Sequence, residues 1–64
     1  MKVENLKENR MYVYTNGIYR RRLWYLECED GKYLFAPVDK KNRLSGCMEK
    51  LSEVEIINHV EEEV

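Results

Sequence analysis

The chain has 64 residues, with 44% hydrophobic residues, five Tyr, one Trp and one Phe, and a formal net charge of −1. A chain of this length buries only about 60% of the surface it exposes when unfolded, which leaves room for one small core and no enclosed catalytic cleft. We therefore expect a single domain over residues 1–64, and the aromatic content argues against a disordered chain.

The N-terminal part contains an irregular segment and the first predicted hairpin. Residues 1–9 show no regular pattern, and we expect them to be loosely ordered. An apolar and aromatic run over residues 11–15 is followed by Asn16-Gly17. Asn-Gly is a preferred pair for a two-residue type I′ turn, because both central residues adopt positive φ. The pattern predicts that a second strand starts at Ile18.

A second hairpin is predicted at Asp30-Gly31, which lies between two runs rich in aromatic and apolar residues. A two-residue turn there sets Glu29 opposite Lys32, a favourable cross-strand pair of opposite charges. The same register sets Cys28 opposite Tyr33 and Leu26 opposite Phe35.

The register assigns side chains to the two faces of the predicted sheet. It directs one group inward, namely Trp24, Leu26, Cys28, Tyr33 and Phe35, and another outward, namely Tyr25, Glu27 and Lys32. The inward alternation, continued backwards, would also bury Arg20 and Arg22. We therefore expect a β-bulge or a bend near Arg20–Arg22, since one extra residue inverts the alternation.

Residues that favour turns and bends follow the third predicted strand. Pro37 ends or edges that strand because it has no N–H to donate. Residues 39–43 are predicted to form a solvated turn, Ser45-Gly46 permits a bend, and residues 47–51 are predicted to form a short fourth strand.

The C-terminal segment supports two interpretations. Ser52 and Glu55 match a capping box, and apolar residues then recur at helical spacing, which favours a short helix over residues 52–62. Alternation of β-branched residues instead suits a strand over residues 54–60 that closes a small barrel. Residues 62–64 are expected to be a frayed tail.

These elements predict a mainly β, α+β fold: a twisted antiparallel meander of three or four strands with a short C-terminal helix. The alternative is an all-β, SH3-like five-stranded small barrel. The residues expected in the core are apolar and come from every predicted element: Met11, Val13, Trp24, Leu26, Cys28, Phe35, Leu51, Val54, Ile57 and Val60.

The residues that usually carry chemistry are few. His59 is the only histidine, and with Cys28 and Cys47 it lacks the close ligand pairs typical of a zinc site. The three glycines are isolated and match turns or bends rather than a phosphate-binding loop. We expect no enzyme activity, no metal and no cofactor, and we expect both cysteines to be free thiols, Cys28 being buried.

One segment combines basic and aromatic residues. Arg20, Arg21 and Arg22 are consecutive, and the nearby tyrosines that complete the candidate partner-binding surface are Tyr12, Tyr14, Tyr19 and Tyr25. Arg and Tyr are enriched at protein-interface hot spots, which favours binding of a protein partner. Stacking aromatics beside Arg also suit a nucleic acid, which is the alternative. A third interpretation needs no partner: the segment is a solvated strand face whose Arg side chains pair with Glu from the acidic half.

The charge distribution bears on the kind of partner. Residues 1–43 have a balance of +4 and residues 44–64 a balance of −5. Such halves suit a weak homodimer, whereas the acidic half opposes a polyanion. No apolar stretch resembles a signal peptide or a membrane span, so we expect a cytoplasmic protein. The function that we favour is a regulatory or inhibitory binding module, a role that analogy with short phage and prokaryotic proteins suggests.

Overall fold

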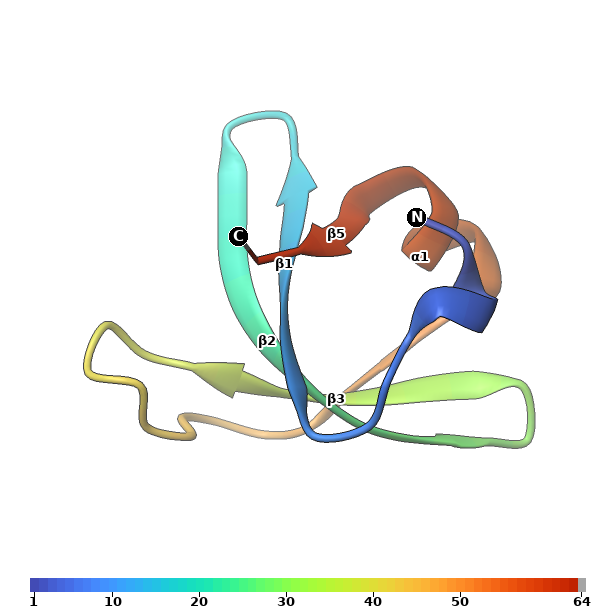
Figure 1. Ribbon diagram of the computed structural model, residues 1–64. Coiled ribbons are helices and arrows are strands. Elements are labelled where there is room, and N and C mark those ends of the chain that lie inside the picture. Colours follow the sequence, from blue (N-terminus) through green and yellow to red (C-terminus); the bar gives the residue numbers. More distant parts are fainter. Residues whose placement is uncertain (64) are drawn as a thin grey trace.

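The computed structural model describes residues 1–63, which form one antiparallel sheet, a short α-helix and an N-terminal turn of 3₁₀-helix (Figure 1). The five strands lie in the order β4-β3-β2-β1-β5. The elements along the chain are η1 (Val3–Asn5), β1 (Arg10–Asn16), β2 (Tyr19–Glu29), β3 (Lys32–Val38), β4 (Glu49–Leu51), α1 (Glu53–His59) and β5 (Val60–Glu62). The predicted mainly β meander with a short C-terminal helix is confirmed, with five strands in place of the three or four expected.

The long strand β2 organises the fold because it belongs to both hairpins. It pairs with β1 from Tyr19 to Tyr25 and with β3 from Arg22 to Glu29. Figure 1 shows that the two hairpins point in different directions, so the sheet is strongly bent. Helix α1 lies on the inner side of this bend.

The two hairpin turns follow local chemistry, although one is displaced by a residue. Asp30 and Gly31 have φ values of +50° and +74°, as a type I′ turn requires, and Glu29 faces Lys32 as predicted. In the first hairpin Asn16 pairs with Tyr19, so the loop is Gly17-Ile18 rather than Asn16-Gly17. Gly17 has a φ of +66° and Ile18 is not in the positive-φ region, which is the type II′ pattern with glycine first.

The register shift in β2 lies between Tyr25 and Glu27, so the bulge is at Leu26 and not near Arg20–Arg22 as predicted. Because an extra residue inverts the alternation, Tyr25 rather than Leu26 faces Phe35. Tyr25 is therefore buried on the inner face. Trp24 faces Ala36 and belongs to the outer face, so its predicted inward position is wrong.

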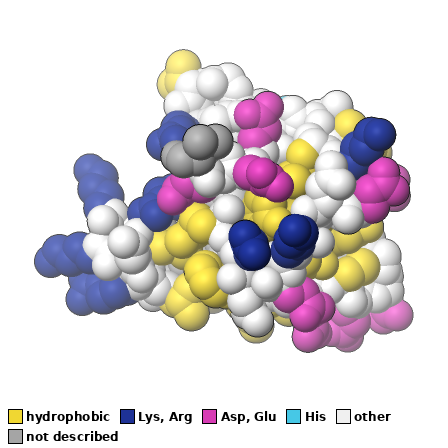
Figure 2. All heavy atoms as spheres, in the orientation of Figure 1, with side chains coloured by type: hydrophobic (Ala, Val, Ile, Leu, Met, Phe, Trp, Pro, Cys, Tyr) yellow, Lys and Arg dark blue, Asp and Glu magenta, His cyan; other side chains and the backbone are white. Residues whose placement is uncertain are grey.

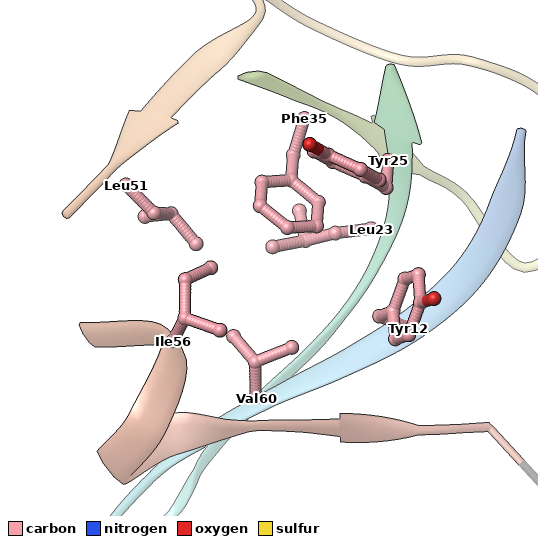
Figure 3. Packing of buried hydrophobic residues seen from close by; sticks show 7 residues of the cluster. All are labelled: Tyr12, Leu23, Tyr25, Phe35, Leu51, Ile56 and Val60. Atoms are coloured by element: carbon pink, nitrogen blue, oxygen red, sulfur yellow. The ribbon is translucent and has the colours of Figure 1, made fainter. Parts of the chain in front are cut away.

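The inner core receives a side chain from every strand and from the helix (Figure 3). Its buried members are Tyr12, Leu23, Tyr25, Phe35, Leu51, Ile56 and Val60. The rings of Tyr12 and Phe35 meet edge to face at 6.4 Å between centroids, a favourable aromatic arrangement. Of the predicted core, Phe35, Leu51 and Val60 are in this cluster.

Helix α1 begins at the predicted capping box. The Glu55 N–H donates to Ser52 Oγ at 3.3 Å, and the Ser52 N–H donates to Glu55 Oε1 at 3.1 Å. Its buried side chain is Ile56, whereas Val54 and Ile57 are 64% and 51% exposed, so their assignment to the core is wrong. The chain becomes a strand only at Val60, and residues 54–59 are therefore helical rather than part of a closing strand.

The outer face of the sheet is also apolar near its centre. Met11, Trp24 and Ala36 form one row across β1, β2 and β3, and Val13 lies on the same face. Ala36 and Val13 are only 5% and 8% exposed, although the inner core does not include them. The sheet therefore buries apolar side chains on both faces.

The N-terminal segment is anchored to the helix. The Met1 ammonium group donates to the carbonyl oxygens of Ile57 at 3.2 Å and Val60 at 3.1 Å. A cation is favourable at this position because the C-terminal end of a helix carries partial negative charge. The side chains of Met1, Val3 and Leu6 also pack against the core, so apolar contacts hold the segment that was expected to be loosely ordered.

Candidate binding surface

Two of the tyrosines proposed for a partner surface are structural. Tyr12 and Tyr25 are 2% and 5% exposed, and the Tyr12 hydroxyl accepts a hydrogen bond from the Lys7 N–H at 2.8 Å. Burial raises the pKa of the Tyr25 hydroxyl. Neither ring is accessible to a partner in the folded protein, so their assignment to the binding surface is corrected.

Tyr14 and Arg21 are engaged with neighbours on the inner face. The Arg21 guanidinium forms an ion pair with Glu49 and lies over the Tyr14 ring, 5.2 Å from its centroid. The other neighbour of Tyr14 is the His59 ring at 5.3 Å. His59 Nδ1 lies 3.0 Å from the Thr15 carbonyl oxygen, which can only accept, so this nitrogen carries the proton. These side chains form a half-buried cluster that connects α1 and β4 to β1 and β2. They are Tyr14, Arg21, Glu49 and His59.

Arg22 is held by the acidic C-terminal segment. Its Nε donates to Glu63 Oε2 at 2.7 Å and its Nη2 to Glu63 Oε1 at 3.0 Å, a bidentate pair. The hydrogen bond from Arg22 lowers the pKa of the Glu63 carboxyl below its ordinary value. Val13 of β1 faces Arg22 of β2 on one side and Glu61 of β5 on the other. The Arg22–Glu63 ion pair therefore reaches across β1 on the outer face of the sheet. Pairing of Arg with Glu from the acidic half therefore accounts for two of the three arginines.

The exposed part of the predicted surface is the tip of the first hairpin. Tyr19 is 68% exposed, Arg20 is exposed, and Ile18 in the loop is fully exposed. We call Ile18, Tyr19 and Arg20 the hairpin tip. Ile18 was not among the predicted site residues, although a Gly-Ile loop of type II′, in place of the Asn-Gly loop, would have placed it at the apex.

A groove adjoins the hairpin tip where β2 and β3 diverge. It has a volume of about 430 Å³, and its lining residues come from β2, the end of β3 and the following loop. They are Arg20, Arg21, Arg22, Pro37, Val38, Asp39, Lys40 and Ser45. The groove thus has apolar side chains beside cationic ones.

The charges of the molecule are separated along the β2–β3 direction. Figure 2 shows Lys and Arg side chains around the 39–43 loop, at the left of the view, and Asp and Glu side chains at the opposite, Asp30-Gly31 end. Asp39 is engaged locally, because its Oδ1 accepts from the Lys41 and Arg43 N–H groups and its Oδ2 pairs with Arg43. These hydrogen bonds lower the pKa of the Asp39 carboxyl. Within residues 1–63, Arg20 and Lys40 are the groove cations without an ion pair.

The remaining candidate chemistry is dispersed. Cys28 and Cys47 are both exposed free thiols, so the predicted burial of Cys28 is wrong; it lies near the solvated end of the second hairpin, opposite Tyr33. Residues 1–63 hold no group of three side chains suited to bind a metal ion. Nor does this part of the chain contain a helix long and apolar enough to cross a membrane.

Comparison of the chain with known protein families, curated proteins and solved structures found no match. The hairpin tip and the groove beside it are therefore interpreted from their own geometry and charge.

Proposed function

We propose that the protein is a non-catalytic binding module that recognises a protein partner through the hairpin tip. The observation that carries this proposal is the full exposure of Ile18 beside Tyr19 and Arg20. A type II′ loop has no need for a large apolar residue at its second position, whereas a partner that covers Ile18 would remove its apolar surface from water. Tyr and Arg are the residue types that most often dominate such contacts.

The same surroundings favour a protein over a nucleic acid. A single-strand binder needs several exposed aromatic rings and free cations along one track. Here Tyr12 and Tyr25 are buried, while Arg21 and Arg22 pair with carboxylates. Few exposed aromatic rings and unpaired cations therefore remain for base stacking and phosphate contact.

The bent β2, shared between two hairpins, is a feature in common with SH3-like small barrels, but the sheet is open: β4 and β5 are its edges, and helix α1 occupies the place of the expected closing strand. Exposed free thiols suit a reducing compartment, which supports a cytoplasmic location. Oppositely charged ends also support weak self-association. Sedimentation at two salt concentrations tests the last point, and a monomer at high micromolar concentration in low salt would contradict it.

Site-directed photo-crosslinking tests the proposed function. A photoreactive phenylalanine analogue replaces Tyr19 in one variant and Lys32, an exposed residue of the second hairpin, in a control. A protein captured from Tyr19 alone is then purified, and its affinity is measured for the native chain and for Tyr19→Ala. We expect Tyr19→Ala to weaken binding by about 30-fold, the equivalent of about 2 kcal/mol. Equal capture at both positions, or an unchanged affinity, would contradict the proposal.

A further inference from the structure

One stretch of β2 has a free edge inside the sheet. Its partner β1 pairs with residues from Tyr19 onward, but β3 joins the other edge only at Arg22. In a ladder, the backbone groups of successive residues point alternately to the two neighbouring strands. Because Asn16 and Tyr19 flank a two-residue loop and exchange hydrogen bonds, the N–H and C=O of Arg20 are the groups of this stretch that point away from β1. They face the groove without a strand partner among residues 1–63.

The divergence of β3 creates the space beside this edge. After Val38 the chain turns away into a loop that folds back on β3, with a bridge between Val38 and Leu44 and a Ser45 N–H bond to the Pro37 carbonyl oxygen at 2.8 Å. An extended segment advances about 3.4 Å per residue, so the three-residue edge matches roughly 10 Å of added strand. The groove of about 430 Å³ runs along this edge, with Pro37 and Val38 as its apolar side.

The charged side chains beside the free edge of β2 favour particular residues in a segment that would pair with it. Arg20 lies on the outer face, because it faces Thr15 across the ladder and alternates with Arg21. The glutamates at residues 61–63 line a pocket together with Arg20, but none of these described glutamates forms an ion pair with Arg20. A residue that pairs with Arg20 on an added strand would place its side chain on the same face, where the guanidinium attracts a carboxylate. Lys40 adds a second cation at the opposite side of the groove.

From these features we infer that the groove binds an extended acidic segment of a protein partner, which adds to the free edge of β2 as a short strand. This inference depends on the proposed protein-binding function and specifies its ligand. Main-chain hydrogen bonds to the N–H and C=O groups of Arg20 supply affinity, while the Arg20 and Lys40 side chains favour acidic residues on one face of the segment. Pro37 and Val38 favour an apolar residue in the segment.

A peptide titration tests the inference. The probe is a blocked octapeptide in which Glu alternates with Val or Thr, and the control peptide has Lys in place of each Glu. Binding to the full chain is followed by amide shifts in ¹H–¹⁵N spectra at low and physiological salt. We expect saturable shifts confined to residues 18–22 and 37–40, weaker binding at higher salt, and at least tenfold weaker binding of the Lys peptide.

Variants of protein and peptide test the two parts of the inference. Arg20→Glu and Lys40→Glu should each weaken binding of the Glu peptide at least tenfold. Arg10→Glu, the same change of charge on the exposed start of β1, should alter it less than about twofold. Peptides with N-methyl groups on alternate backbone nitrogens, one for each of the two registers, test strand addition. One register should lose binding and the other retain it.

Several results would overturn the inference. They are equal binding of the Lys peptide, an effect of Arg10→Glu as large as that of Arg20→Glu, or retained binding by both N-methylated peptides. Tighter binding of an oligothymidylate, lost in Arg20→Glu, would assign the groove to nucleic acid instead. If the Glu peptide fails to bind while a crosslinked partner still depends on Tyr19, the groove inference fails and the proposed function stands. If neither binds, both fail.

Discussion

The contribution of Ile56 offers the sharpest test of how the helix packs. Ile56 is 0% exposed, and Ile57, the next residue of the same helix, is 51% exposed. Ile→Ala removes three carbon atoms, which at about 0.8 kcal/mol per buried CH₂ corresponds to roughly 2.4 kcal/mol at Ile56 before any cavity is counted. With the cavity, the cost of Ile56→Ala falls within the ~2–5 kcal/mol found for such changes, and we expect about 3 kcal/mol.

Ile57→Ala is a matched control. Both positions lie inside α1, so the difference in helix propensity between Ile and Ala affects both variants equally and cancels in their comparison. Because half of the Ile57 side chain is already in water, its removal should cost about 1 kcal/mol or less. The two variants should therefore differ by about 2 kcal/mol.

Urea denaturation followed by far-ultraviolet circular dichroism measures this difference. A domain of 64 residues has a total stability of roughly 3–10 kcal/mol at typical values per residue, so Ile56→Ala should shift the midpoint strongly. In thermal unfolding the two variants should differ by about 10 °C, since 1 kcal/mol shifts the midpoint of a small domain by about 4–8 °C. Equal destabilisation, or a larger effect of Ile57→Ala, would refute the packing described for α1.

Three further predictions concern the turns, the thiols and the acidic tail. Gly31→Val should lower stability by about 1–3 kcal/mol through its positive φ alone, since an added Cβ meets no atom within 4 Å; an unchanged denaturation midpoint would contradict this. Cys28 and Cys47 should both react with a thiol reagent in the native protein, and a protected Cys28 would be inconsistent with its exposure. Since Arg22 lowers the pKa of Glu63, their pair stabilises the fold above the ordinary pKa of 4.5, and this contribution is lost as pH falls through the lowered pKa. Glu63→Gln should therefore reduce the acid sensitivity of unfolding, and identical pH profiles would disprove it.

Features set by a few neighbouring residues could be predicted from the sequence. Asp30-Gly31 supplies two residues that tolerate positive φ, and Ser52 with Glu55 forms a cap from its own side chains. Neither depends on the rest of the fold. The second hairpin and the start of the helix were therefore predicted correctly.

The assignment of faces could not be predicted in the same way. Leu23, Trp24, Tyr25 and Leu26 are all apolar, so both alternations of β2 offer an apolar face. The position of the bulge, at Leu26, decides between them. The sequence pattern contains no local signal for that choice.

Only part of the candidate binding surface was predicted, because the face on which each β2 side chain lies depends on the position of the bulge. Arg20 and Tyr19 are exposed as expected, whereas Tyr25 follows the inverted face into the core. The engagement of Arg21 and Arg22 depends on Glu49 and Glu63, which are remote in sequence and come close only in the folded chain. Pairing of these arginines with Glu from the acidic half was one interpretation of the sequence, but the sequence did not indicate which Glu pairs with which Arg.

The contacts between the two ends of the chain constrain how the domain can form during synthesis. Strand β1 pairs with β5, and the Met1 ammonium group closes the end of α1. Ribosomes add about 5–20 residues per second, so residues 1–16 wait several seconds before residues 60–62 are made. During this interval the β1–β2 hairpin lacks both its outer neighbour and the helix that covers its inner face. Completion of the fold therefore requires synthesis of residues 60–62, and a nascent chain stalled before Val60 should be sensitive to proteases.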